Sequence, residues 1–148
     1  MDTLKLYRTN RKRSSTVSQT ARSFVDFEVS GLSLYPEIHE RQYDLISCLG
    51  WVSPMFDKIS LSRLLSNNSG DMHDNRVALY VCPECVDPFC GGITTKVSVL
   101  PDVVIWDQFT FDNGWEAEPE MFQFYKLEGL GPYRFERSHY ENTIRSFV

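Results

Sequence analysis

Three consecutive runs with the residue alternation of β-strands occupy the middle of the chain and constrain its fold more than any other feature. The runs are residues 77–81, 93–99 and 103–111. In the third run the odd-numbered residues are expected on one face of a strand and the even-numbered residues on the other. Short turns separate the runs, and short turns join antiparallel neighbours. The sequence therefore predicts an antiparallel β-meander over Val77–Phe111, with a cysteine loop at one end.

Shorter β and helical patterns precede the meander. Residues 24–29 are mostly β-formers, and a Ser-Gly pair can turn the chain into residues 32–35, which predicts a hairpin. Apolar residues recur at approximately helical spacing over 37–49, and a second short helix is indicated over 59–65. We therefore expect a few short helices between the hairpin and the meander.

The C-terminal stretch has the signature of a terminal helix. Ser138 followed by Glu141 matches a capping box, in which each side chain bonds an unpaired backbone N–H of the first turn. Tyr140, Ile144 and Phe147 supply an apolar stripe. The predicted fold class is α+β, an antiparallel β-meander with a cysteine-rich loop, packed against a few short helices and a C-terminal helix.

A chain of 148 residues has the length of one domain. Residues 1–22 carry six basic side chains and one acidic side chain, and we interpret them as a basic flexible arm before a single α+β domain over 23–148. An alternative is that Lys5–Arg13 contacts an acidic surface of this chain or of a partner. The arm lacks the apolar region of a secretory signal. No apolar run reaches the roughly 20 residues that cross a bilayer, so we expect a cytoplasmic protein that binds no membrane.

The charge balance argues against nucleic acid as a partner. The formal net charge is −5 at pH 7, with an isoelectric point near 5.2. Such a balance repels phosphate backbones unless a local basic patch overrides it. We expect no nucleic-acid partner and a monomer in the free state.

The cysteine cluster is the strongest chemical signal. Three of the four cysteines, Cys82, Cys85 and Cys90, fall within nine residues. A C-x2-C turn lets two thiolates approach one ion, and sulfur ligands suit tetrahedral Zn²⁺. We predict a structural zinc site with ligands Cys82, Cys85, Cys90 and His73. Other candidates for the fourth ligand are His139, Cys48, Asp87 and a water molecule.

Two other interpretations of the cluster stay open. The thiols can be reduced side chains in a tight turn, or a redox dithiol if one thiolate is stabilised at a helix N-terminus. The motif lies between strand runs rather than at the start of a helix, which disfavours the redox interpretation. Cys48 lies in the apolar stretch 46–51, where we expect a small buried hydrophobic residue. No residue is predicted to be catalytic.

Several motifs together resemble one family. They are L-G-W (residues 49–51), L-Y-V-C-P-E-C (79–85), C-G-G-I-T (90–94), V-I-W-D-Q-F (104–109) and G-P-Y-R-F-E-R-S-H-Y-E (131–141). In order and spacing the chain resembles a widespread family of small bacterial proteins over roughly residues 24–148. Some members look like immunity proteins that accompany polymorphic toxins, and others carry an oxidoreductase label. The resemblance implies a cognate toxin as the partner. The basic arm and the linker Val86–Phe89 depart from the usual member, in which a glycine-containing linker is commoner.

An acidic and aromatic segment suggests where such a partner binds. Between residues 102 and 128 the chain has seven acidic side chains, one lysine and many interleaved aromatic rings. Toxin domains that act on nucleic acid often have basic clefts, which an acidic aromatic loop can fill. The predicted partner-binding residues are Asp112, Trp115, Glu116, Glu118, Glu120 and Phe122. The bland alternative places most of these rings in the core, and the competing function is a thiol- or metal-dependent enzyme that uses the cysteine cluster.

Overall fold

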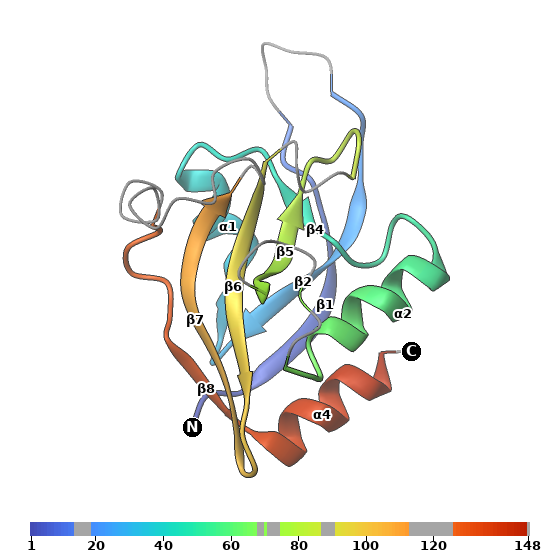
Figure 1. Cartoon of the computed structure of the whole chain (residues 1–148). Coiled ribbons are helices and arrows are strands. Elements are labelled where there is room, and N and C mark those ends of the chain that lie inside the picture. Colours follow the sequence, from blue (N-terminus) through green and yellow to red (C-terminus); the bar gives the residue numbers. More distant parts are fainter. Residues whose placement is uncertain (14–18, 68–69, 71–74, 87–90, 113–125, 148) are drawn as a thin grey trace.

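The structure is a computed structural model, and it describes residues 1–13, 19–67, 70, 75–86, 91–112 and 126–147. Its fold class is α+β, as predicted (Figure 1). The strands are β1 (Leu4–Asn10), β2 (Ser23–Val29), β3 (Leu32–Ser33), β4 (Ile46–Ser47), β5 (Val77–Val81), β6 (Gly92–Val99), β7 (Val103–Asp112) and β8 (Tyr133–Glu136). The helices are α1 (Leu34–Glu40), α2 (Pro54–Arg63) and α4 (Arg137–Ser146).

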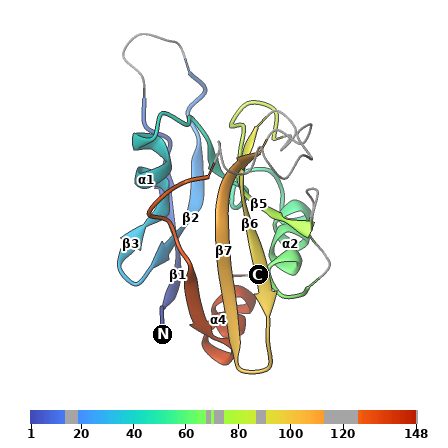
Figure 2. The same ribbon diagram turned by 60° about the vertical axis from the view of Figure 1, so that its left-hand side comes forward.

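The strands of the described residues form two antiparallel sheets. The smaller sheet has the order β1-β2-β3 and the larger has the order β4-β5-β6-β7-β8. Two isolated bridges join the sheets. One links Asp2, just before β1, to Phe135 in β8, and the other links Val25 in β2 to Leu49, just after β4. The larger sheet therefore curves round to meet the smaller one along both of its sides, as Figures 1 and 2 show.

Aromatic side chains fill the space between the two sheets. Phe27 of β2 lies edge-on to Tyr80 of β5 and to Trp106 of β7, with ring centroids 6.1 and 5.5 Å apart. Tyr140 of α4 closes this core at 6.0 Å from the Trp106 ring, and all four side chains are fully buried. Burial of large rings supplies most of the apolar area that holds the sheets together.

The predicted meander is confirmed, with one correction to its alternation. β5, β6 and β7 pair antiparallel in sequence order. The register shifts between Thr94 and Lys96, opposite Gln108, whose φ is 57°. Such a bulge inserts one extra residue and reverses the alternation beyond it. Trp106 and Phe109 are therefore both buried, although the period of two assigned them to opposite faces.

The prediction of a flexible arm over residues 1–22 is wrong for its first part. Residues 4–10 form β1, which pairs with β2 from Leu4 opposite Val29 to Asn10 opposite Ser23. Leu4 is buried, whereas Lys5 and Arg8, the two basic residues of the strand, are exposed. The alternation of Leu4, Lys5 and Leu6 gives the physical reason, because alternating apolar and charged residues suit a half-buried strand.

Two helical predictions also need correction. The helix predicted over 37–49 is shorter and earlier, at 34–40, and Ile46–Ser47 pairs with β5 as β4. The capping box is absent from α4: the helix begins at Arg137 with Glu136 as its N-cap, and no side chain caps it. The Ser138 hydroxyl instead donates to the Glu136 carboxylate at 2.5 Å. No helix in the described part of the chain has the length and apolar character to cross a membrane.

Candidate binding site at the cysteine end of the larger sheet

Three strands of the larger sheet end or begin at the same place. β5 ends at Val81, directly before Cys82, and Gly92 at the start of β6 pairs with Asp112 at the end of β7. We call this the cysteine end, defined by Val81, Gly92 and Asp112. It lies at the top of Figures 1 and 2, opposite α4. The topology therefore brings the C-x2-C motif and Asp112, one of the predicted partner-binding residues, to one end of the molecule.

The C-x2-C motif forms a turn that directs the chain back toward β6. The N–H of Val86 donates to the carbonyl of Cys82 at 3.0 Å. Val86 has a φ of 67°, a left-handed conformation that is costly for a β-branched residue. Cys82 is half-buried and Cys85 is exposed. A turn that returns after four residues keeps both thiols on one short loop, which fits the donor spacing of a zinc site.

The structure describes only some of the other residues considered as zinc ligands. His73 and Cys90 lie outside the described residues, as does Asp87, one of the alternatives. His139 lies on α4 at the opposite end, and its Nε2 accepts the N–H of Leu4 at 2.9 Å. Cys48 is buried, as expected for a small hydrophobic residue. In the described part of the chain no three His, Cys, Asp or Glu side chains gather as a metal site.

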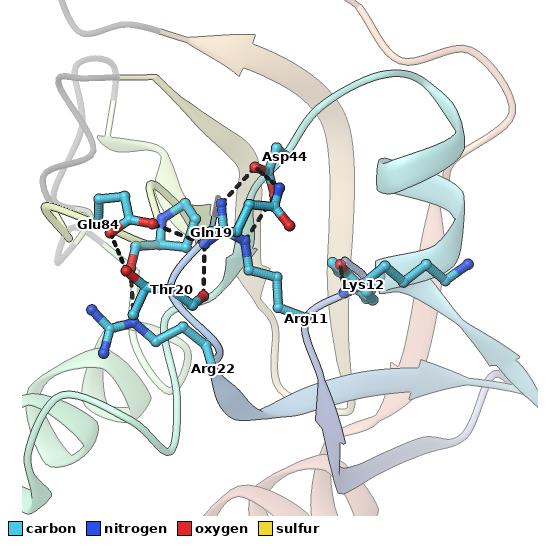
Figure 3. A network of polar contacts seen from close by, with 9 residues as sticks. Arg11, Lys12, Gln19, Thr20, Arg22, Asp44 and Glu84 are labelled. Carbon is cyan, nitrogen blue, oxygen red and sulfur yellow. Dashed lines mark hydrogen bonds and ion pairs between the residues drawn. The ribbon is translucent and has the colours of Figure 1, made fainter. Parts of the chain in front are cut away.

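A buried arginine links the N-terminal strands to the cysteine turn (Figure 3). The Arg11 side chain is 5% exposed and forms two hydrogen bonds with Asp44, Nε to Oδ1 at 3.1 Å and Nη2 to Oδ2 at 2.6 Å. Its Nη1 donates to Glu84 Oε1 at 2.9 Å and to the carbonyl of Thr20 at 2.9 Å. A planar guanidinium suits this paired geometry, which a lysine cannot reproduce.

Two further contacts hold the residues between Cys82 and Cys85. The Thr20 hydroxyl donates to Glu84 Oε2 at 2.9 Å. Arg22 Nε donates to the carbonyl of Pro83 at 2.9 Å, and its guanidinium lies 4.9 Å from the centroid of the Trp51 ring. Residues that precede β2 thus contact both inner positions of the C-P-E-C turn.

The network lowers the pKa of Glu84 and leaves the side chains of Asp44 and Glu84 about half exposed. The hydrogen bond from Arg11, and then that from Thr20, lowers the pKa of Glu84 below its usual value. The hydrogen bond with Asp44 is the largest cause that raises the pKa of Arg11. The side chains of Asp44 and Glu84 are 45% and 51% exposed, so each presents one side to solvent. One buried cation therefore fixes two half-exposed anions.

The predicted partner-binding residues lie mostly beyond the described residues. Trp115, Glu116, Glu118, Glu120 and Phe122 fall in 113–125, which the structure does not describe. Asp112 is described and is 6% exposed, so its side chain is not available as a surface contact in this conformation.

Both flanks of 113–125 lie on β7. Lys126 bridges Thr110, and the N–H of Leu127 donates to the carbonyl of Phe109 at 2.9 Å. The chain therefore leaves β7 after Asp112 and returns to the same strand at residue 126.

The described aromatic residues of the acidic segment are buried or half-buried. Trp106 and Phe109 are buried, as the bland interpretation of these rings expects. Phe111 is half-buried and stacks on Tyr43, with ring centroids 4.9 Å apart and planes 14° apart. A Cβ on Gly91, whose φ is 124°, would lie 3.0 Å from the Phe111 ring, so glycine is needed there. An aromatic pair thus lies beside Asp44 at the cysteine end.

Sequence reasoning missed the roles of Arg11, Asp44 and Glu84. Asp44 and Glu84 lie 33 and 73 residues from Arg11 in the chain, so no local pattern connects the three residues. The one available signal was the basic stretch itself. Its alternative interpretation, contact with an acidic surface of this chain, is confirmed at Arg11.

Comparison of the chain with protein-family models, with curated proteins and with solved structures gave no match. The resemblance to immunity proteins therefore stays a prediction, and the functional argument depends on the geometry of the cysteine end.

Proposed function

We propose that this chain is a binding protein, specifically an immunity protein that neutralises a cognate bacterial polymorphic toxin through its cysteine end. In this proposal Cys82, Cys85, Cys90 and His73 hold a structural zinc ion. The partner is a protein, neither nucleic acid nor a membrane, and the free chain is a cytoplasmic monomer.

One observation carries the proposal. The flanks of segment 113–125 lie on β7 at the cysteine end, where Asp44 and Glu84 already present half-exposed carboxylates. The sequence of that segment adds Glu116, Glu118 and Glu120 with three or more aromatic rings. An acidic surface with aromatic anchors is suited to a basic cleft, because opposite charges steer association and buried rings slow dissociation.

The rigidity of the site supports the same proposal. Asp44 and Glu84 are held by hydrogen bonds from Arg11, and the half-buried rings of Tyr43 and Phe111 stack beside Asp44. Side chains ordered before binding lose less conformational entropy when a partner docks. The site therefore has the preorganisation expected of a tight inhibitor surface.

The proposed zinc ion has a structural role in this account. The turn bond between Cys82 and Val86 positions two thiols on one loop, and a third thiol and an imidazole from residues 90 and 73 complete a tetrahedral donor set. Zinc would join the loop before β5 to the loop after it. The zinc ion would stabilise the folded cysteine end and would take part in no reaction.

Binding kinetics with the proposed cognate toxin domain test the proposal. Trp115→Ala is expected to raise the dissociation rate, because it removes a buried anchor, and to leave the association rate nearly unchanged. Reversal of Glu116, Glu118 and Glu120 to Lys is expected to slow association and to reduce its dependence on ionic strength.

A matched reversal of Glu28, Asp102 and Glu136 is the control, because it changes the net charge by the same amount. Asp102 lies in the turn between β6 and β7, Glu136 pairs with Val103, and Glu28 pairs with Lys5 near the start of β1, all away from the cysteine end. The control is expected to slow association far less than the reversal in segment 113–125. Equal effects of the two reversals would mean that only net charge matters, and would remove the proposed interface.

A further inference from the structure

The two residues between the cysteines are held by the N-terminal part of the chain rather than by their own loop. Arg22 bonds the backbone of Pro83, while Arg11 and Thr20 each bond one oxygen of the Glu84 carboxylate, all at 2.9 Å. Figure 3 shows these side chains converging on the turn from one side. The turn that carries both thiols is therefore docked on Arg11, Thr20 and Arg22.

The residues that hold the turn are themselves fixed. Arg11 is buried and bound to Asp44 as well as to Glu84, and its own N–H donates to the carbonyl of Arg22 at 2.9 Å. The Lys12 N–H donates to the hydroxyl of Tyr35 at 2.9 Å, which ties the end of β1 to α1. The position of the cysteine turn is thus set by contacts that continue into the core.

We propose that the N-terminal hairpin of β1 and β2 acts, through Arg11 and the residues 19–22 before β2, as a clamp that positions the Cys82–Cys85 turn for its ligand. Arg11, Thr20 and Arg22 are its positioning residues, with Glu84 as the contact they share. The inference rests on the proposed zinc site, since zinc is the ligand considered. Groups that orient metal ligands from outside the coordination shell commonly change metal affinity by about 10- to 100-fold.

The clamp implies reciprocal coupling. If docking of the hairpin raises the affinity of the turn for zinc, zinc must strengthen docking of the hairpin by the same factor. A hairpin that is detached from the turn leaves Glu84 without its hydrogen bonds from Arg11 and Thr20. The same clamp would therefore link zinc binding to the acidic surface at the cysteine end.

Glu84→Ala is the most informative variant, because it removes two of the three clamp contacts, those from Arg11 and Thr20. The Glu84 side chain is half exposed, and the substitution leaves buried Arg11 in place. Glu136→Ala, an exposed carboxylate at the opposite end, is the matched control. Arg11→Gln is a second variant that breaks the same clamp from the other side. Circular dichroism and thermal melting verify that each variant folds.

The first readout is Zn²⁺ affinity, measured by competition with a chromophoric chelator. We expect Glu84→Ala to weaken binding by about 10- to 100-fold and Glu136→Ala to match the parent. The second readout is the rate at which iodoacetamide modifies Cys82 in the reduced, metal-free protein. Cys82 is half-buried, so release of the turn should speed its modification several-fold.

The outcomes separate the clamp from the zinc site. Zinc binding by the parent with equal affinity in Glu84→Ala would overturn the clamp and leave the zinc site standing. A parent that binds no zinc would reject the zinc site, and the modification rate alone would then decide. In that case faster modification of Cys82 in Glu84→Ala supports the clamp, and equal rates overturn it.

Discussion

The side chain of Asp26 is fully buried in β2 and accepts hydrogen bonds from other parts of the fold. The Tyr80 hydroxyl donates to its Oδ1 at 2.6 Å, and the Tyr35 N–H and the Tyr7 hydroxyl donate to its Oδ2 at 3.0 and 3.2 Å. Burial raises the pKa of Asp26, and the hydrogen bonds from Tyr80 and Tyr35 only partly oppose it. The folded state therefore holds its proton more strongly than the unfolded state does.

This shift sets the sign of a pH dependence. A carboxyl whose pKa is raised on folding contributes stability below its unfolded pKa, about 3.9, and loses it as pH rises through the folded value. Asp26→Asn should remove this contribution, and the Tyr80 hydroxyl can rotate to accept from the new amide. Urea unfolding at several pH values from 4 to 8 should show a flatter decline in the free energy of unfolding for Asp26→Asn. An unchanged slope would show that Asp26 does not titrate in this way.

The sequence could not reveal this role of Asp26. In the run 24–29 Asp26 and Glu28 alternate with β-formers, a pattern that is typical of solvent-facing positions. Here α1 covers that face of β2, with Tyr35 5.0 Å from Phe24 between ring centroids, and the hydroxyl that satisfies Asp26 comes from β5. Burial of a polar group is decided by partners that are distant in sequence.

At the scale of secondary-structure elements, one hydroxyl joins α4 to two other parts of the fold. Tyr140 of α4 donates to the carbonyl of Leu64, just after α2, at 2.7 Å. It accepts the indole N–H of Trp106 on β7 at 3.0 Å. All the groups are buried, and burial raises the pKa of Tyr140 well above its usual value.

Tyr140→Phe should therefore destabilise the fold, because it leaves a buried N–H and a buried carbonyl without this partner. Loss of such a shared hydroxyl costs about 1–3 kcal/mol. Tyr43→Phe, which keeps the stack on half-buried Phe111, is the control and should cost less. The free energies of unfolding from urea titration compare the two variants. Equal, small losses in both would indicate that the Tyr140 hydroxyl is not important for stability.

The sequence correctly predicts the elements that depend on local residue patterns. The meander and the hairpin at Ser30-Gly31 follow from alternation and turn residues, and both turn residues have positive φ, at 50° and 87°. The bulge at Gln108 and the pairing of β4 have no such pattern. Buried Arg76 donates to the carbonyls of Thr94 and Gln108 on both strands of the bulge, a contact that only the folded chain creates.

At the scale of the whole molecule, the two sheets and the loops at one end form a connected structure. The α+β class follows from the order of the predicted elements, but the incorporation of residues 4–10 into a sheet does not. The motif predicts the position of the C-x2-C turn. No motif predicts the contact between Arg11 and Glu84, because the two residues are 73 residues apart in the chain. Contacts between distant segments explain most of what sequence patterns missed.

The measurement that tests the central claim most directly is survival of cells that co-express this chain with its proposed cognate toxin domain. We predict that cells with the parent protein or with the Glu28, Asp102 and Glu136 reversal survive. Cells with the reversal of Glu116, Glu118 and Glu120 should die, although that variant folds.

Cys82→Ser separates binding from catalysis in the same assay. A binding protein should lose protection in this variant only to the extent that it loses its fold or its affinity for the toxin, whereas an enzyme should lose protection with both intact. Full protection by the folded reversal of Glu116, Glu118 and Glu120 would contradict the proposed interface, and loss of protection by a folded, toxin-binding Cys82→Ser would contradict the binding account.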